Sequence, residues 1–121
     1  MSIQLLHTTA WGDIDFLVVD TPPGTGKIPR ALLARAHLSA ALVVTTPSTL
    51  ATADVVRGVD MLNRFGVPVL AIVENMSSFT CDGCGKEHFP FGRGHVEEVI
   101  ASIRANAALD DVRVCVCVCV L

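Results

Sequence analysis

Two cysteines separated by two residues form the sharpest chemical signal in this sequence. Cys81 and Cys84 belong to the run Cys-Asp-Gly-Cys-Gly. Thiolates three positions apart bind one metal ion or two irons of a cluster, and the glycines ease the turn that brings the thiolates together. The spacing therefore predicts a metal-binding loop.

The residue pattern leaves several kinds of chemistry open for this pair. A thioredoxin-type redox pair begins a helix, whereas Gly85 and the residues after it predict none. A zinc knuckle would recruit His88 and His95 as further ligands. One pair is also half of a site that a homodimer completes with the same two cysteines of its partner. Two free loop cysteines are the structural alternative.

A second group of candidates follows two apolar runs. Asp20 ends the run Phe16–Val19 and precedes Thr-Pro-Pro-Gly-Thr-Gly, which includes Gly24. An aspartate at the carboxyl end of a buried parallel strand faces the ligand side of the sheet, and in nucleotide hydrolases it holds Mg²⁺ through water. Glycines there let backbone N–H groups approach a phosphate. Helix capping by Asp20 beside an ordinary turn is the alternative.

Asn75 comes soon after the apolar run Val69–Val73. Its amide offers both a donor and an acceptor, as the edge of a nucleotide base requires. An Asx turn that leaves the strand is the alternative.

Short apolar runs alternate with helical patterns along the chain. The runs are apolar on both faces, which predicts strands buried on both sides of a parallel sheet; they are Phe16–Val19, Ala41–Thr45 and Val69–Val73. Helices are predicted over residues 28–37, 49–65 and 95–107. The order predicts an α/β doubly wound sheet. Residues 74–94, rich in glycine, predict a functional loop.

Composition excludes several classes of protein. The chain has 121 residues, of which 51% are hydrophobic and 17% charged, with a mean hydropathy of +0.55. These values exclude intrinsic disorder. A net charge of −3 predicts no nucleic-acid partner, and no apolar run is long enough to cross a membrane. Residues 1–10 have no signal or transit pattern, so we expect a cytoplasmic protein, or a mitochondrial or plastid one if an upstream targeting segment is missing.

The tail of the chain has a different character. Residues 112–121 read Val-Arg-Val-Cys-Val-Cys-Val-Cys-Val-Leu, in which the dipeptide Val-Cys repeats with no polar face. The segment is either an edge strand, by β propensity, or the erroneous translation of a GT dinucleotide repeat. We expect the tail to be dispensable for binding a metal cluster or a partner, and its deletion to raise solubility. We divide the chain into a domain at residues 1–107 and an atypical Val/Cys-rich tail at residues 108–121.

Taken together, several fragments resemble the Mrp/ApbC family of P-loop ATPases that carry iron–sulfur clusters, in the MinD/ParA-like superfamily. The matching fragments run from Trp11 to Gly26, Ala41 to Pro47, Val67 to Leu70, Val73 to Ser77, Cys81 to Gly85 and Phe91 to Gly92. Their joint order and spacing are specific, although each fragment is weak alone.

The resemblance implies a role for each matched position. Asp20 would be the Walker B aspartate near Mg²⁺, Gly24 would lie in the switch region that senses the γ-phosphate, and Asn75 would contact adenine. Cys81 and Cys84 would ligate a 4Fe–4S cluster shared across a homodimer. The family delivers such clusters to apoproteins and couples transfer to ATP turnover.

The sequence also departs from the family. It contains no Gly-x-x-x-x-Gly-Lys-Ser/Thr pattern, so the phosphate loop is missing. Lys27 stands where the family usually has Asp, and Ser48 where it usually has Gln. We therefore expect the C-terminal part of the ATPase domain: an α/β, partial doubly wound parallel sheet of the P-loop NTPase type that lacks the phosphate-loop half.

The expected function is iron–sulfur cluster binding and transfer to apoproteins, with ATP hydrolysis undecided because the Walker A loop is missing. A non-enzymatic zinc- or partner-binding remnant of the ATPase fold is the alternative. A positioning ATPase of the MinD/ParA type is disfavoured, since it has no need of Cys81 and Cys84.

Overall fold

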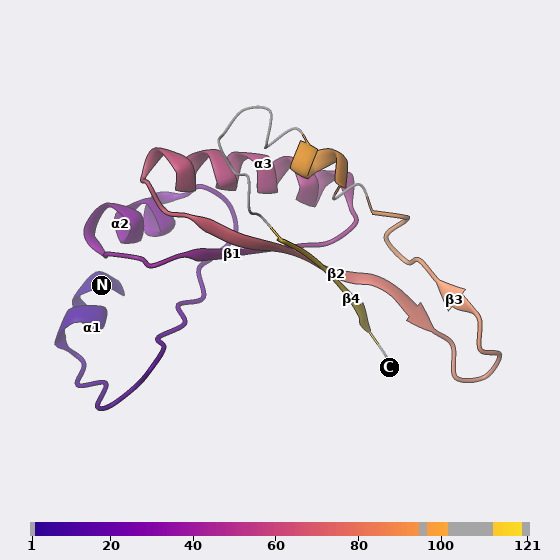
Figure 1. Cartoon of the computed structure of the whole chain (residues 1–121), viewed down its shortest axis with the longest axis horizontal. Coiled ribbons are helices and arrows are strands. Elements are labelled where there is room, and N and C mark those ends of the chain that lie inside the picture. The colour runs from indigo at the N-terminus through magenta and orange to yellow at the C-terminus, as the bar shows by residue number, and fades with distance from the viewer. Residues whose placement is uncertain (1, 95–96, 102–112, 120–121) are drawn as a thin grey trace.

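The computed structural model describes residues 2–94, 97–101 and 113–119. A small mixed β-sheet lies at its centre (Figure 1). Strand β1 (Ala41–Thr45) runs parallel to β2 (Val69–Thr80), and β4 (Arg113–Cys119) runs parallel to β2 on its other side. The short β3 (Glu87–His88) pairs antiparallel with the end of β2. The prediction of an α/β fold with parallel strands is confirmed.

Helices α2 (Lys27–Arg35) and α3 (Thr49–Arg64) lie where the sequence predicts helices, within two residues at each end. Helix α3 ends before Gly66, whose φ of +69° is the left-handed conformation that glycine adopts readily. Helix α1 (Ser2–Thr8) lies where no helix was predicted. Of the helix predicted at 95–107, residues 97–101 are helical, and the other positions lie outside the described residues.

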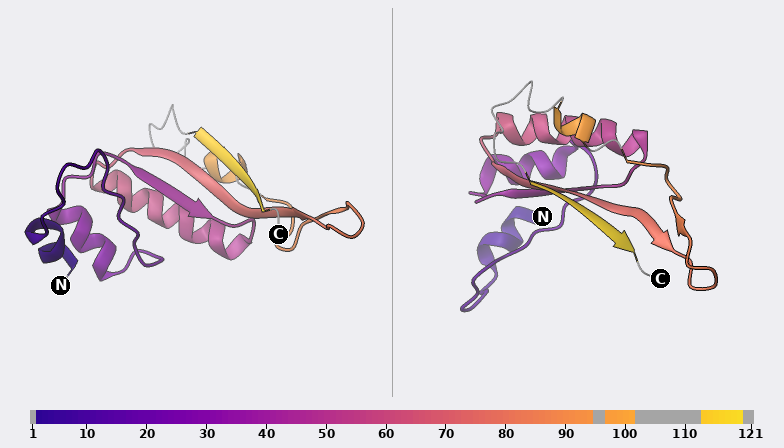
Figure 2. Two further views of the ribbon diagram at one scale, coloured as in Figure 1. Left: turned by 90° about the horizontal axis from the view of Figure 1, so that it is seen from below. Right: turned by 45° about the vertical axis from the view of Figure 1, so that its right-hand side comes forward.

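The core lies between α3 and one face of the sheet (Figure 2). Val59 of α3 and Ile72 of β2 are the most completely buried side chains, at 1% and 0% exposure. The other buried members are Val55, Val69, Val99 and Ile100. The helical residues 97–101 thus share the α3 side of the sheet, and β2, which bears the candidate metal loop at its end, is anchored by this core.

The opposite face of the sheet differs from the expectation. Leu42 and Val44 of β1 are 62% and 64% exposed, so the prediction that this run is buried on both sides is wrong for the described structure. The physical reason is that α3 and residues 97–101 both pack on the face that carries Val43 and Ile72. In the described part of the chain, the apolar side chains on the other face of β1 therefore meet solvent.

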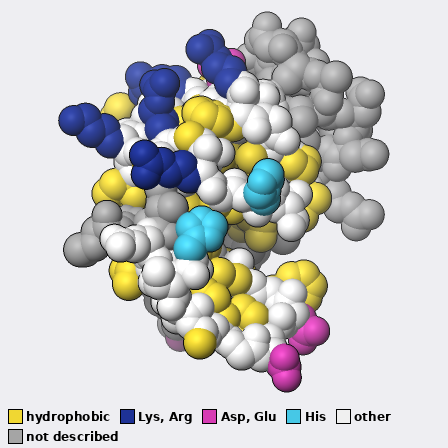
Figure 3. Space-filling model, turned by 90° about the vertical axis from the view of Figure 1, so that its left-hand side faces the viewer, with side chains coloured by type: hydrophobic (Ala, Val, Ile, Leu, Met, Phe, Trp, Pro, Cys, Tyr) yellow, Lys and Arg dark blue, Asp and Glu magenta, His cyan; other side chains and the backbone are white. Residues whose placement is uncertain are grey.

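Residues Phe16–Val19 do not form the predicted strand, and Phe16 and Val18 are each 88% exposed. A buried strand needs neighbouring strands for its N–H and C=O groups. Within the described residues Phe16–Val19 pairs with no strand, although the outer edge of β1 is unpaired there. The segment between α1 and α2 is irregular in the described structure. Figure 3 shows this end of the molecule, where hydrophobic side chains lie at the surface among Lys and Arg.

Two further segments differ from the sequence interpretation. The functional loop predicted at 74–94 begins later, because β2 continues to Thr80 and pairs with both β3 and β4. The tail forms strand β4 over Arg113–Cys119, which is the edge-strand alternative. No helix among the described residues has the length and apolar character needed to span a membrane.

Candidate metal centre

The cysteine pair lies in the tight turn that joins β2 to β3. The N–H of Cys81 donates to the carbonyl of Lys86 at 2.9 Å, and the N–H of Gly85 donates to the carbonyl of Cys81 at 2.7 Å. Gly85 has a φ of +67°, which a residue with a Cβ rarely adopts. These backbone bonds close the turn and bring the ends of the Cys-x-x-Cys run together.

Both thiols are accessible, and the turn favours the ionised form of one of them. Cys81 is half-buried, Cys84 is exposed, and neither is in a disulfide. Backbone N–H groups of Gly83 and Cys84 donate to the sulfur of Cys81, and together with the Cys84 side chain they lower the pKa of the Cys81 thiol. Because the thiolate is the metal ligand, the turn prepares Cys81 for metal binding.

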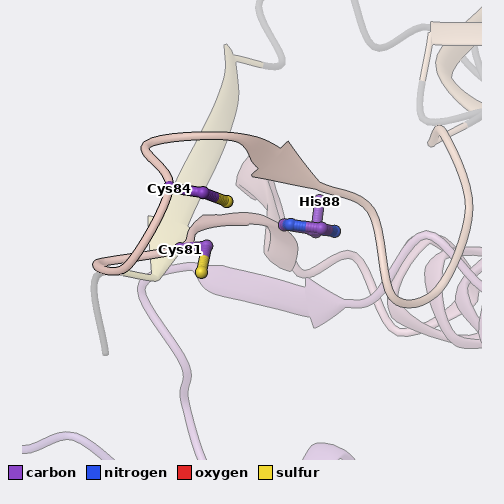
Figure 4. Close-up of side chains that lie close together, drawn as sticks. All are labelled: Cys81, Cys84 and His88. Atoms are coloured by element: carbon purple, nitrogen blue, oxygen red, sulfur yellow. The ribbon is translucent and has the colours of Figure 1, made fainter.

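His88 is the third member of the group (Figure 4). The ligand atoms of Cys81, Cys84 and His88 all lie within 4.8 Å of one another. Pairing of β3 with β2 sets Phe79 opposite His88, and the two rings stack with centroids 5.1 Å apart and planes at 17°. His95, the other histidine considered from the sequence, lies outside the described residues.

A hydrogen bond beside this stack holds β3 against β2. The hydroxyl of Ser78, a buried residue, donates to Glu87 Oε1 at 2.7 Å. Sequence spacing alone does not reveal this support, because Ser78 and Glu87 meet only through the β2–β3 pairing.

Asn75 lies inside β2 and not after its end. The N–H of Met76 donates to Asn75 Oδ1 at 2.9 Å, and Met76 has a φ of 57°. The register with β4 also shifts between Glu74 and Ser78. Asn75 thus marks an irregular point in the strand, a local role close to that of the predicted Asx turn.

Asp20 and Gly24 lie in the irregular segment between α1 and α2, and both are exposed. The predicted position of Asp20 at the end of a buried strand is wrong in the described structure, because residues 16–19 form no strand. Figures 1 and 2 show α1 and the β2–β3 hairpin at opposite ends of the molecule. The structure therefore groups Cys81 and Cys84 with each other and with His88.

Glu74 is a buried charged residue that sequence reasoning missed. It is 4% exposed, and its Oε2 has no hydrogen-bond partner within the described part of the chain. A Cβ at position 94 would overlap the Glu74 carboxylate, so Gly94 lets the chain pass close to it. The available signal was an acidic residue directly after the apolar run Val69–Val73.

The structure thus combines an α/β domain with parallel strands and a Cys-Cys-His group at the surface that could hold a metal ion. One solved structure that this chain resembles is a nucleotide-binding protein from Archaeoglobus fulgidus, described as being in complex with ADP and with cobalt. It matches 92% of this chain and 42% of its own, with a TM-score of 0.70 and 32% identity.

The family model for the NUBPL iron-transfer P-loop NTPases, of the ParA group, matches residues 1–114. The chain belongs to this family, which confirms the resemblance to Mrp/ApbC proteins.

The curated relatives are named as iron–sulfur cluster assembly or carrier proteins. The chloroplastic Fe-S cluster assembly factor HCF101 of Arabidopsis thaliana is 52% identical over 80% of this chain and 18% of its own length. Iron-sulfur cluster carrier proteins of Haemophilus influenzae and Escherichia coli are 47% and 44% identical, over 79% and 80% of this chain and 26% of their own lengths. The chain thus spans about a fifth to a quarter of these relatives.

Proposed function

We propose that this chain carries an iron–sulfur cluster as cargo and passes it to recipient apoproteins. The observation that carries the proposal is the placement of Cys81 and Cys84 in one exposed turn, with a lowered pKa at Cys81. Accessible thiolates suit a cargo that must leave, because a departing cluster has to meet the recipient's ligands at the surface.

The cargo we propose is a 4Fe–4S cluster held between two copies of the chain. A cluster of this type takes four thiolates, and one Cys-x-x-Cys turn supplies two. A twofold-symmetric contact sets a turn opposite its own copy and supplies the other two. The names of the curated relatives, which are cluster assembly and carrier proteins, support the class of cargo.

Nucleotide roles for Asp20, Gly24 and Asn75 belong to the same proposal. The solved relative in complex with ADP and the match to P-loop NTPases support them. In a nucleotide site that a phosphate loop completes, Asp20 would hold Mg²⁺, Gly24 would face the γ-phosphate, and Asn75 would face adenine. This sequence has no phosphate-loop pattern, so we do not propose that these residues bind nucleotide by themselves. We propose the cytoplasm as the compartment, or a plastid, as in the name of the Arabidopsis relative.

Anaerobic reconstitution with ferrous iron and sulfide tests the proposal. The wild-type chain should develop broad visible absorption, sediment as a dimer, and restore the spectrum of an apo-ferredoxin. Cys81→Ala and Cys84→Ala should each abolish the absorption and the cluster-dependent dimer. A triple variant with serine at Cys115, Cys117 and Cys119 is the matched control and should keep both. A chain that gains no visible absorption refutes the proposal.

A further inference from the structure

The side chain of His88 has a position and an orientation that the carriage of a shared cluster does not require. Its ring nitrogen lies within 4.8 Å of both cysteine sulfurs, on the strand that returns from the turn (Figure 4). All three ligand atoms come from one hairpin of one chain. They therefore form a site that needs no second copy.

Packing on β2 fixes the His88 ring before any metal arrives. The ring stacks on Phe79, its direct neighbour across the two strands. The bond from buried Ser78 to Glu87 holds the adjacent position of β3. Prior ordering of a ligand lowers the entropy that binding must overcome, so His88 is better prepared for coordination than an unsupported surface histidine.

Two thiolates and one imidazole select a chemical class of ion. Soft sulfur ligands together with imidazole suit Zn²⁺, Co²⁺ and Fe²⁺, whereas Mg²⁺ and Ca²⁺ prefer oxygen. Metal–ligand bonds of about 2.0–2.3 Å put the donors of a tetrahedral site roughly 3.3–3.8 Å apart. The observed limit of 4.8 Å is about 1 Å wider, and rotation of the two cysteine side chains toward the stacked His88 ring can close this difference.

We propose that Cys81, Cys84 and His88 bind one divalent transition-metal ion within a single protomer and leave its fourth coordination position open. Binding displaces the protons of the two thiols to solvent. The open position accepts water or the thiolate of another molecule. This inference goes beyond the proposed function, since it requires neither a cluster nor a dimer.

Cobalt titration of the reduced full chain under anaerobic conditions tests the inference. Four-coordinate Co²⁺ with sulfur ligands shows strong visible bands and sulfur-to-metal charge transfer, and the bands move when a nitrogen ligand is lost. We expect one Co²⁺ per chain, with the protein still sedimenting as a monomer. One Co²⁺ per two chains would show a shared site and overturn the inference.

Matched variants separate coordination from packing. His88→Phe keeps an aromatic ring against Phe79 but removes the donor nitrogen, so its Co²⁺ affinity should fall at least about tenfold and its bands should shift. His37→Ala removes an exposed histidine elsewhere in the chain and should change neither. Unchanged bands and affinity in His88→Phe would overturn the inference. A Cys81→Ser chain that keeps the wild-type bands would do the same, because other cysteines would then be the ligands.

Failure of this inference differs from failure of the proposed function. A chain that binds Co²⁺ through His88 but never assembles a cluster refutes carriage and leaves the single-protomer site standing. A chain that assembles a cluster, and in which His88→Phe binds Co²⁺ as the wild type does, supports cluster carriage and overturns the single-protomer site.

Discussion

The sulfur of Cys81 accepts hydrogen bonds from the backbone N–H groups of Gly83 and Cys84, which lower the pKa of this thiol. A lowered pKa means that the thiolate persists at lower pH in the folded chain than in the unfolded one. We therefore expect alkylation of Cys81 by iodoacetamide to reach half of its maximal rate at a lower pH in the native chain than in urea. Peptide mass spectrometry across a pH series measures this, and equal midpoints in the two states would contradict it.

We expect the buried side chain of Glu74 to lower the stability of the folded chain. Its carboxyl group is buried, and among the described residues Oε2 has no hydrogen-bond partner; an unsatisfied buried polar atom costs about 1–3 kcal/mol, more when it is charged. Replacing the carboxylate with a neutral amide lowers this cost. Because the amide is itself polar, only part of the cost is removed, and we expect Glu74→Gln to raise the free energy of unfolding by about 1 kcal/mol in urea titrations.

Glu97→Gln, at an exposed position, is the control for this variant and should change stability by less than about 0.5 kcal/mol. Destabilisation by Glu74→Gln would show that the carboxylate makes a favourable interaction in the native chain.

The β2–β3 hairpin brings Cys81, Cys84 and His88 together. Its two glycines, Gly83 and Gly85, differ in backbone conformation. Gly85 has a left-handed φ of +67°, whereas a Cβ on Gly83 would meet only the sulfur of Cys81 at an ordinary 3.9 Å. We expect Gly85→Ala to cost about 1–2 kcal/mol of stability and to weaken Co²⁺ binding. Gly83→Ala is the matched control and should bind Co²⁺ as the wild type does. Equal affinities in the two variants would show that the turn does not depend on the conformation of Gly85.

Local pattern predicts elements whose partners are close in sequence, and it fails where the partner is distant. The run Ala41–Thr45 is a strand with the predicted bounds, and Cys81 and Cys84 lie together as their spacing indicates. Phe16–Val19 shares the Leu-Val-Val run, yet a strand also needs hydrogen bonds to a neighbour that local pattern does not identify, and in the described structure this run pairs with no strand. The sequence indicates His88 only as an alternative metal ligand, because its distance from the two cysteines depends on the register between β2 and β3.

At the scale of the whole molecule, the tail joins the sheet. Strand β4 pairs with β2 from Ala71↔Arg113 to Phe79↔Cys119, so it covers one edge of the strand that leads into the metal loop. An uncovered strand edge is a template for aggregation. We now expect deletion of residues 113–121 to lower the unfolding midpoint and to promote aggregation, contrary to the dispensable tail expected from the sequence.

Removal of residues 120–121 alone is the control for this deletion, because it leaves every β4 pair in place. Thermal unfolding and light scattering measure both effects. A deleted chain that stays monomeric with an unchanged midpoint would show that the tail is dispensable.

Nucleotide binding is the other property of the whole molecule. A phosphate loop supplies the backbone cradle and the lysine that neutralise the phosphates, and this sequence has no such pattern. Asp20 and Gly24 lie in an irregular, exposed segment, while Asn75 lies within β2. We therefore expect Mg²⁺-ATP to bind this chain with a Kd above about 1 mM, which corresponds to less than about 4 kcal/mol of binding free energy.

Isothermal titration calorimetry measures the affinity for Mg²⁺-ATP, and Asp20→Asn and Asn75→Ala should leave it unchanged. Micromolar binding that either variant abolishes would show that these residues form a nucleotide site without the loop.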